Sequence, residues 1–159
     1  MFAGYLNDAA ATADVLRDGW LETGDLGALG REGQVFVHGR MRAMIKRAGA
    51  AIAPREIEEI ADEVRGVRRS AAIGVHFGPD ALTEEVCVVV EVERGLDELE
   101  RAVVRRSVVD SVRAALGFAP HDLRLVAPGT IPRTRTGKTQ YAELRRQIEG
   151  DGALFHRNG

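Results

Sequence analysis

Residues 85–92 read Glu-Val-Cys-Val-Val-Val-Glu-Val, a run of β-branched and apolar side chains that predicts a buried β-strand. Another apolar run covers residues 71–77, and the Gly-Pro-Asp sequence at residues 78–80 is typical of a turn. We therefore expect the two runs to pair as antiparallel strands. Cys87 is the single cysteine of the chain, so we expect a small buried thiol and neither an internal disulfide nor a cysteine-based metal site.

Helical patterns lie on both sides of these strands. The first begins at Pro54, which suits the first turn of a helix, continues with apolar residues at i, i+3, i+4 and i+7, and is expected to close at Gly66. The second is longer, carries acidic residues in its first turn and is followed by Gly117. Its expected apolar face is formed by Leu96, Leu99, Val103, Val109, Val112 and Leu116.

The remaining patterns complete the predicted fold. A third short strand is expected over residues 123–127, and a last helix is expected from Tyr141 to Ile148, closed by Gly150. The order of helices and strands predicts an α+β fold, in which helices flank a small mixed β-sheet.

A β-hairpin is predicted to precede that sheet. The turn at residues 30–33 separates residues 20–27 from the alternating run 34–38, and this places Asp25 near one end of the hairpin. Residues 1–19 are small and polar and indicate only a turn at residues 18–19.

The composition narrows the class of protein. The chain has 159 residues, of which 45% are hydrophobic and 29% charged, as in a globular protein with a core. Its formal net charge of -2 gives no positive field for nucleic acid. No apolar stretch approaches the ~18 residues that a membrane span needs, and no signal peptide is visible, so we expect a cytoplasmic protein. The histidines show no metal-binding spacing, and no metal site is expected; they are His38, His76, His121 and His156.

One loop carries the clearest chemical signal. Residues 131–139 read Ile-Pro-Arg-Thr-Arg-Thr-Gly-Lys-Thr, which places Lys138 in a Gly/Thr-rich loop before the last helix. Such a loop can present one ammonium group to anionic oxygens. A phosphate-binding P-loop would need glycine at position 132, where Pro132 lacks both the amide hydrogen and the required conformation. A plain surface turn with a solvated lysine stays open as an alternative.

Two further segments carry polar groups. Asp25 follows Thr23 and Gly24, and its carboxylate could accept hydrogen bonds from sugar hydroxyls or bond its own backbone in a turn. Residues 39–58 mix basic and apolar side chains, and taken alone they favour a solvated basic face over a binding site.

In their order along the chain, these three segments resemble the C-terminal portion of the adenylate-forming ligases. That family includes acyl-CoA synthetases, fatty acyl-AMP ligases, luciferases and nonribosomal peptide adenylation domains. Residues 18–26, Asp-Gly-Trp-Leu-Glu-Thr-Gly-Asp-Leu, resemble the family's DGW–TGD segment. Residues 39–58 resemble its segment from Gly-Arg to Pro-x-Glu-Ile-Glu, and residues 132–138 resemble its Pro-Lys/Arg-Thr-x-Ser/Thr-Gly-Lys loop. The form of that loop favours acyl-CoA or acyl-AMP ligases over peptide-synthetase domains.

The resemblance implies an ATP-dependent ligase that joins a carboxylic acid substrate to AMP. It implies that Lys138 reaches the carboxylate and the α-phosphate, that Asp25 holds the ribose hydroxyls of ATP, and that Arg40 assists near the ribose or phosphates. In many members the acyl group then passes to a thiol of CoA or of the phosphopantetheine of an acyl carrier protein.

The resemblance also implies a rotation of the small domain between the two reactions. Arg42 occupies the hinge position, which is usually lysine or aspartate. Lys46 and the backbone around Gly49 would face the active site in the thioester-forming pose. ATP with magnesium would be held mainly by a large N-terminal domain.

The domain boundaries follow from the same resemblance. Residues 1–40 would end the large adenylation domain, residues 41–150 would form the mobile C-terminal domain, and residues 151–159 would be a disordered tail. The missing N-terminal domain would be the partner of this chain, which we expect to be inactive by itself. The alternative is a free-standing, non-catalytic module that docks on a ligase or a carrier protein.

Overall fold

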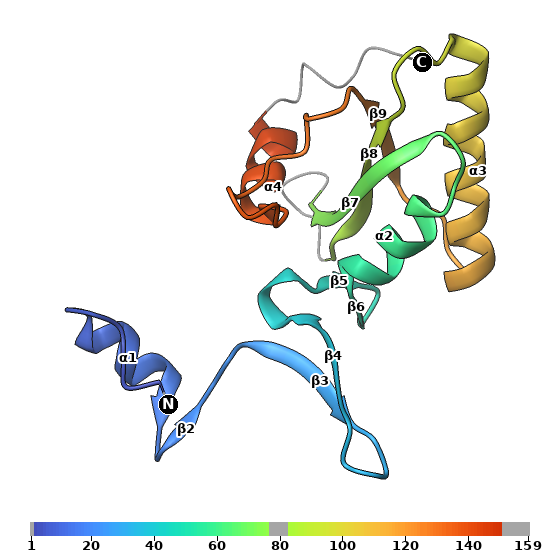
Figure 1. Ribbon diagram of the computed structural model, residues 1–159. Coiled ribbons are helices and arrows are strands. Elements are labelled where there is room, and N and C mark those ends of the chain that lie inside the picture. The colour runs from blue at the N-terminus through green and yellow to red at the C-terminus, as the bar shows by residue number, and fades with distance from the viewer. Residues whose placement is uncertain (1, 77–82, 151–159) are drawn as a thin grey trace. The chain divides into compact units, whose positions relative to one another are not determined.

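The computed structural model describes residues 2–76 and 83–150 (Figure 1). The chain divides into two compact units, Met1–Arg42 and Ala43–Gly159. The division falls two residues after the predicted boundary, and the assignment of the first part to a larger preceding domain stays a prediction. The predicted turn at residues 78–80 and the tail at 151–159 lie outside the described residues.

The second unit is built on a mixed sheet of three strands within the described residues. The strand order is β7 (Val67–Val75), β8 (Glu85–Val92), β9 (Asp122–Val126). β7 and β8 are antiparallel, as predicted, whereas β8 and β9 are parallel. The parallel pair is connected through the long helix α3 (Glu98–Leu116), because a parallel crossover needs a connection of this length. The predicted α+β fold is confirmed.

Both faces of the central strand β8 are buried, which explains its nearly continuous apolar sequence. One face packs with α3 and with α2 (Pro54–Asp62), and the other packs with α4 (Tyr141–Gly150). Figure 1 shows α3 and α4 on opposite sides of the sheet. Cys87 is buried as predicted, and burial raises the pKa of its thiol to about 12.

The predicted end of α2 is wrong, and the predicted face of α3 is only partly right. α2 ends at Asp62, four residues before Gly66. Gly66 instead has φ 92°, and a Cβ at this position would lie 2.8 Å from Val104 on α3, so the glycine permits close packing. The predicted face of α3 is partly confirmed, because Val112 belongs to the core and Leu96, Val109 and Leu116 pack against it. Val104 and Val108 complete the buried face, whereas Leu99 and Val103 are 74% and 58% exposed.

Side chains cover parts of both outer strands of the sheet. On β9, the Arg101 guanidinium donates to the Leu125 carbonyl at 3.3 Å, and Arg105 donates to the Leu123 carbonyl. On β7, the Ala72 N–H donates to the Glu58 carboxylate at 2.9 Å. These contacts satisfy backbone groups that would otherwise lie unpaired at the sheet edges.

A small hairpin opens the second unit. Strands β5 (Ile45–Arg47) and β6 (Ala50–Ile52) pair antiparallel, and the buried Ile45 joins the core beneath α2 and α3. The sequence patterns indicate no hairpin here, because each strand is too short for a period of two residues to be recognisable.

The first unit contains α1 (Ala9–Val15), β1 (Leu16–Arg17), β2 (Trp20–Leu21), β3 (Asp25–Leu29) and β4 (Val35–Arg40). The predicted hairpin is confirmed by the antiparallel pairing of β3 and β4. The helix α1 is missed by the sequence analysis, although Asp8 caps it by accepting from the Ala11 N–H at 2.9 Å. Of the described residues 2–42, none is buried.

Candidate functional site

Asp25 and Arg40 form an ion pair at the open end of the β3–β4 hairpin. They are cross-strand neighbours, and Arg40 Nε lies 3.0 Å from Asp25 Oδ1. Arg40 Nη1 also donates to the Thr23 carbonyl at 2.5 Å. The Asp25 side chain is 35% exposed and that of Arg40 is 67% exposed, so the pair itself adds only ~0–1 kcal/mol to stability. Its polar edges remain accessible to hydroxyl groups and anions.

The Thr-Gly-Asp sequence shapes the backbone around this pair. Gly24 has φ 72°, a conformation that favours glycine, and its carbonyl accepts from the Met41 N–H at 2.8 Å. The Thr23 hydroxyl accepts from the Asp25 N–H at 3.1 Å. The turn that the sequence analysis considered for Asp25 is thus held by the Thr23 hydroxyl, and the Asp25 carboxylate bonds Arg40 instead.

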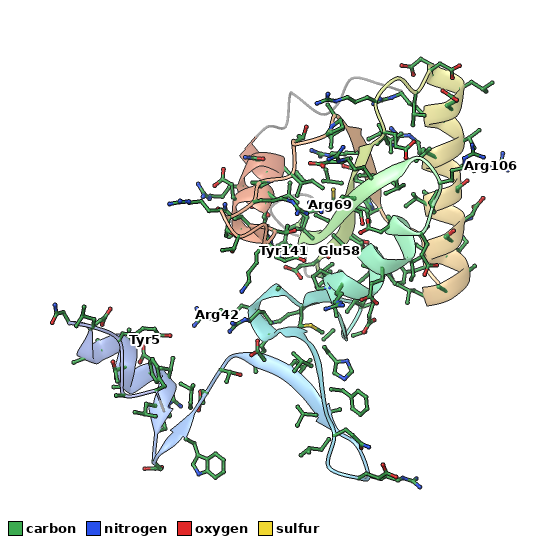
Figure 2. All side chains as sticks on the ribbon, in the orientation of Figure 1. Tyr5, Arg42, Glu58, Arg69, Arg106 and Tyr141 are labelled. Atoms are coloured by element: carbon green, nitrogen blue, oxygen red, sulfur yellow. The ribbon has the colours of Figure 1, made fainter. Side chains whose placement is uncertain are left out.

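Arg42 is the last residue of the first unit. It lies in the short 3-10 helix Met41–Ala43, which spans the division between the units, and it is exposed (Figure 2). The residue expected to be the hinge therefore lies directly before the division between the two compact units.

Lys46 is exposed on β5, and its backbone is fixed at both polar groups. Its N–H donates to Glu84 Oε2 at 2.6 Å, and its carbonyl accepts from the Glu84 N–H at 3.0 Å and the Thr83 hydroxyl at 2.9 Å. Glu84 is 8% exposed and also lies 3.2 Å from the guanidinium of Arg145 on α4. One buried carboxylate therefore connects the backbone beneath Lys46 with α4.

Gly49 lies in the two-residue turn between β5 and β6. Ala48 has φ 47° and Gly49 has φ 81°, and positive φ at both positions is the pattern of a type I′ turn. Nothing lies within 4 Å of the place where a Cβ of Gly49 would be. The glycine is thus needed for the backbone conformation, and its outer surface is open.

Lys138 is exposed on a compact loop that two short backbone contacts close. Arg133 and Thr139 form an antiparallel bridge, and the Thr134 N–H donates to the Lys138 carbonyl at 2.9 Å. The Gly137 N–H donates to the Thr134 carbonyl at 2.9 Å, and Gly137 has φ 85°. This is a hydrogen-bonded hairpin turn, and its shape differs from that of a loop that wraps phosphate groups with its amides.

Side chains reinforce the same loop. The Lys138 N–H donates to the Thr134 hydroxyl at 3.1 Å, and the hydroxyls of Thr134 and Thr136 lie 3.0 Å apart. Arg133 Nη1 donates to the Gly137 carbonyl at 2.9 Å. The two threonines and the glycine of the motif therefore hold the backbone that carries Lys138, while its ammonium group extends from a fixed base.

The lysine content of the chain singles out the same positions. Lys46 and Lys138 are its two lysines, and all other members of its 22 Lys and Arg residues are arginine. An ammonium group is a compact, strongly hydrated point charge, whereas a guanidinium is planar and bidentate. A chain that otherwise carries its positive charge on arginine thus keeps lysine at two exposed positions on fixed backbone.

The polar contacts beneath this loop are not predicted by the sequence patterns. Tyr141 Oη donates to Glu58 Oε2 at 3.0 Å, which joins the first residue of α4 to α2. Burial, opposed by hydrogen bonds from Ala72 and Tyr141, raises the pKa of Glu58. Burial and the Glu58 carboxylate likewise raise the pKa of the Tyr141 phenol. The helical pattern marks Tyr141 as apolar, and nothing local in the sequence signals its partner.

The candidate residues fall into two groups by unit. Asp25, Arg40 and Arg42 belong to the first unit, whereas Lys46, Gly49 and Lys138 belong to the second. In residues 2–76 and 83–150, no three His, Cys, Asp or Glu side chains gather as they would around a metal ion. No helix in the described part of the chain is long and apolar enough to cross a membrane.

Comparison with known proteins identifies relatives of the chain. No family model matches it. The putative ligase Rv1013 of Mycobacterium tuberculosis is 36% identical over 139 residues, which are 87% of this chain and 26% of that protein. The medium/long-chain-fatty-acid–[acyl-carrier-protein] ligase FadD10 of the same species is 33% identical over 150 residues, which are 94% of this chain and 27% of that protein.

The solved structures agree with these relatives. The crystal structure of ATP-bound MatB from Rhodopseudomonas palustris matches with a TM-score of 0.74 and 30% identity, over 93% of this chain and 28% of that one. The chain thus spans about a quarter of the length of the curated relatives that it matches, 26% and 27% for the two above. By sequence and by fold, it corresponds to the C-terminal domain of the adenylate-forming ligases.

Proposed function

We propose that the chain acts as the C-terminal part of an ATP-dependent ligase that converts a carboxylic acid to an acyl-adenylate, with Lys138 as its catalytic residue. The observation that carries this proposal is the construction of the Lys138 loop. Its ammonium group is exposed, and the backbone beneath it is held by Thr134 and by Arg133. Relatives named as fatty-acid ligases support the class of reaction.

The chemistry explains why a positioned cation is needed. A carboxylate oxygen attacks the α-phosphorus of ATP, the bond from that phosphorus to the β-phosphate oxygen breaks, and pyrophosphate leaves. Because both reactants are anions, their approach is opposed by charge repulsion. The Lys138 ammonium group would lower this repulsion and stabilise the charge that develops on the α-phosphate oxygens.

Asp25 and Arg40 are proposed to bind the nucleotide. The free edge of the Asp25 carboxylate can accept hydrogen bonds from the ribose hydroxyls, and Arg40, which already bonds Asp25, can extend the pair towards the ribose or phosphates. Magnesium accompanies ATP in this proposal, but the described residues offer it no cluster of ligands. We therefore assign no residue of this chain to the metal.

A second step, thioester formation, is proposed to use Lys46 and Gly49. Arg42 would be the hinge at which the second unit rotates, since the chain divides directly after it. The open surface at Gly49 suits close approach of a pantetheine arm. The name of FadD10 mentions an acyl carrier protein, which supports carrier-bound phosphopantetheine as the acceptor, with CoA as the other candidate.

The proposal includes a larger N-terminal domain as partner. Large apolar side chains of the first unit are exposed on its strands, which include Trp20, Leu29, Val35, Phe36 and Val37. A hairpin that buries nothing is at best marginally stable, so these side chains need further protein to pack against. Such a domain would also bind most of the ATP and the acid, and the 159-residue chain is expected to be inactive by itself.

The test compares the two lysines in the ligase that contains this chain. We expect Lys138→Ala to reduce acid-dependent ATP–pyrophosphate exchange by about 100-fold or more, as for other preorganised electrostatic groups. Lys46→Ala is the matched control, because it should leave this exchange nearly unchanged and slow acyl transfer to the thiol. Equal loss of exchange in both variants, or none in Lys138→Ala, would refute the assigned roles.

A further inference from the structure

The Lys138 loop is followed at once by a contact that ties it to the rest of the second unit. Tyr141 is three residues beyond Lys138, and its hydroxyl donates to Glu58 Oε2 at 3.0 Å. The other carboxylate oxygen, Oε1, accepts from the Ala72 N–H of β7 at 2.9 Å. Figure 2 shows Glu58 and Tyr141 side by side, reaching from α2 and α4. One carboxylate thus joins α2, β7 and α4.

Hydrogen bonds within the loop define its shape, and its placement therefore depends on its ends. The Gln140 N–H donates to the Pro132 carbonyl at 2.9 Å, which joins the two ends of the loop. At the first end, the buried Ile131 N–H donates to Glu91 Oε1 at 2.9 Å. At the second end, Tyr141 bonds Glu58, and four residues further along α4 the guanidinium of Arg145 lies 3.2 Å from Glu84. The Tyr141 contact is the nearer of the two to Lys138; without it, the second end would be held by the packing of α4 and by the more distant Arg145–Glu84 pair.

The contact holds a carboxyl group partly out of water. Glu58 is largely buried, and burial raises the pKa of its carboxyl group. An apolar pair of similar size is often as stable as a buried polar link or more so. Arg133, from the first end of the loop, lowers the pKa of both Glu58 and Tyr141, so its guanidinium charge acts on the same pair. The Glu58 carboxylate therefore interacts with a residue near each end of the loop, with the charge of Arg133 and with the hydroxyl of Tyr141.

We infer that Tyr141 and Glu58 are positioning residues, whose hydrogen bond sets the place of the Lys138 ammonium group for the adenylation step. This inference rests on the proposed role of Lys138. Neither residue touches the reactants. Their contact fixes the second end of the loop, and the hydrogen bonds within the loop transmit that position to Lys138. A misplacement of about 1 Å at a reacting centre can cost about 100-fold in rate, so a single distant contact can matter.

Amide hydrogen exchange on the 159-residue chain tests the positioning directly. Tyr141→Phe removes the hydroxyl and keeps the ring, which packs against the core between α4 and the sheet. We expect the Gln140 and Thr134 amides to exchange about tenfold faster, as for the loss of one hydrogen bond to a charged group, while the amides of β8 keep their rates. Unchanged rates in the loop, or equal acceleration in β8, would overturn the inference.

Matched variants separate the hydrogen bond from general damage. The chain has two tyrosines, and Tyr5→Phe in the first unit removes the other hydroxyl, so it should leave the loop rates unchanged. Glu58→Gln can still accept from Ala72 and contact Tyr141, and we expect loop protection close to that of the unmodified chain. Glu58→Ala should lose it. If the loop amides exchange as fast in Glu58→Gln as in Glu58→Ala, the contact between residue 58 and Tyr141 does not protect the loop.

Kinetics in the ligase that contains this chain supply the functional readout. Tyr141→Phe should lower kcat for ATP–pyrophosphate exchange by about tenfold and leave KM for ATP nearly unchanged, because the ground-state complex is not altered. A change in KM alone would overturn the inference. If Lys138→Ala leaves exchange intact, the proposed function fails, and the amide exchange data still decide whether Tyr141 and Glu58 fix the loop.

Discussion

The two units of this chain differ in what they bury. The second unit encloses the strand β8 between helices on both faces, and its core includes Ile57, Val88 and Val108 at 0% exposure. The first unit has a helix and two strand pairs, yet none of its described residues is buried. Hydrogen bonds, ion pairs and contacts between exposed side chains therefore maintain its local shape. Since net stability comes mainly from apolar burial, the second unit carries the means to fold alone and the first does not.

This difference also separates the candidate site residues. Lys46, Gly49 and Lys138 lie on elements that a packed core supports. Asp25 and Arg40 lie on the hairpin that buries nothing, although they are bonded to each other at 3.0 Å. The geometry around Lys138 can thus be studied in the isolated chain, whereas the proposed nucleotide binding by Asp25 is best tested in the ligase that contains this chain.

The largest expected effect comes from separating the units. A fragment of residues 43–150 should unfold in one cooperative transition, whereas a fragment of residues 2–42 should show no cooperative transition, because it has no core. Thermal unfolding followed by circular dichroism measures both. A sharp transition in the 2–42 fragment would break the comparison between the units.

One substitution in the core of the second unit and one on the first unit compare how far the two units are packed. Ile57→Ala should lower the free energy of unfolding by about 3 kcal/mol, because it leaves a cavity where α2 packs on the sheet. Leu29→Ala, at a side chain that is 77% exposed, should change it by less than about 0.5 kcal/mol. Urea denaturation of the full chain measures both values, and similar losses would mean that the first unit is packed after all.

Two turns allow a smaller and more local comparison. Asp18 and Ala48 each open a two-residue hairpin turn with positive φ, at 50° and 47°. Aspartate tolerates this conformation better than alanine does. Ala48→Gly should therefore stabilise the second unit by about 1 kcal/mol. Asp18→Gly serves as control and should leave the stability of the second unit unchanged in urea denaturation. A loss of stability in Ala48→Gly would show that the Cβ of Ala48 makes a favourable contact.

The smallest expected effect is a change in pH dependence. Burial raises the pKa of Glu58 above its ordinary 4.5, so the folded state binds this proton more tightly than the unfolded state. Its contribution to stability is therefore full below about pH 4.5 and is lost as the pH rises through the folded pKa. Glu58→Gln should remove this decline, and urea denaturation between pH 4 and pH 8 measures it. Parallel pH profiles for the two proteins would count against the shift.

Much of the second unit could be predicted because its signals are local. Residues 85–92 are so rich in valine that a buried strand follows from them directly, and Pro54 and Gly117 mark helix ends at or next to the observed ones. The face of α3 could not be predicted in the same way. Leu99 and Val103 fit an apolar stripe as well as Val104 and Val108 do, and only the position of the sheet decides which stripe is buried.

The sequence by itself determined the order of the elements from α2 to α4, the turn glycines and the choice of lysine at two positions in an arginine-rich chain. Each of these depends on a few neighbouring residues and on their intrinsic conformational or chemical preferences. The tertiary structure decided the parallel pairing of β8 with β9, the burial of Glu84 and the bond from Tyr141 to Glu58, 83 residues earlier. Those features depend on which surfaces meet when distant segments pack, and no local pattern encodes that meeting.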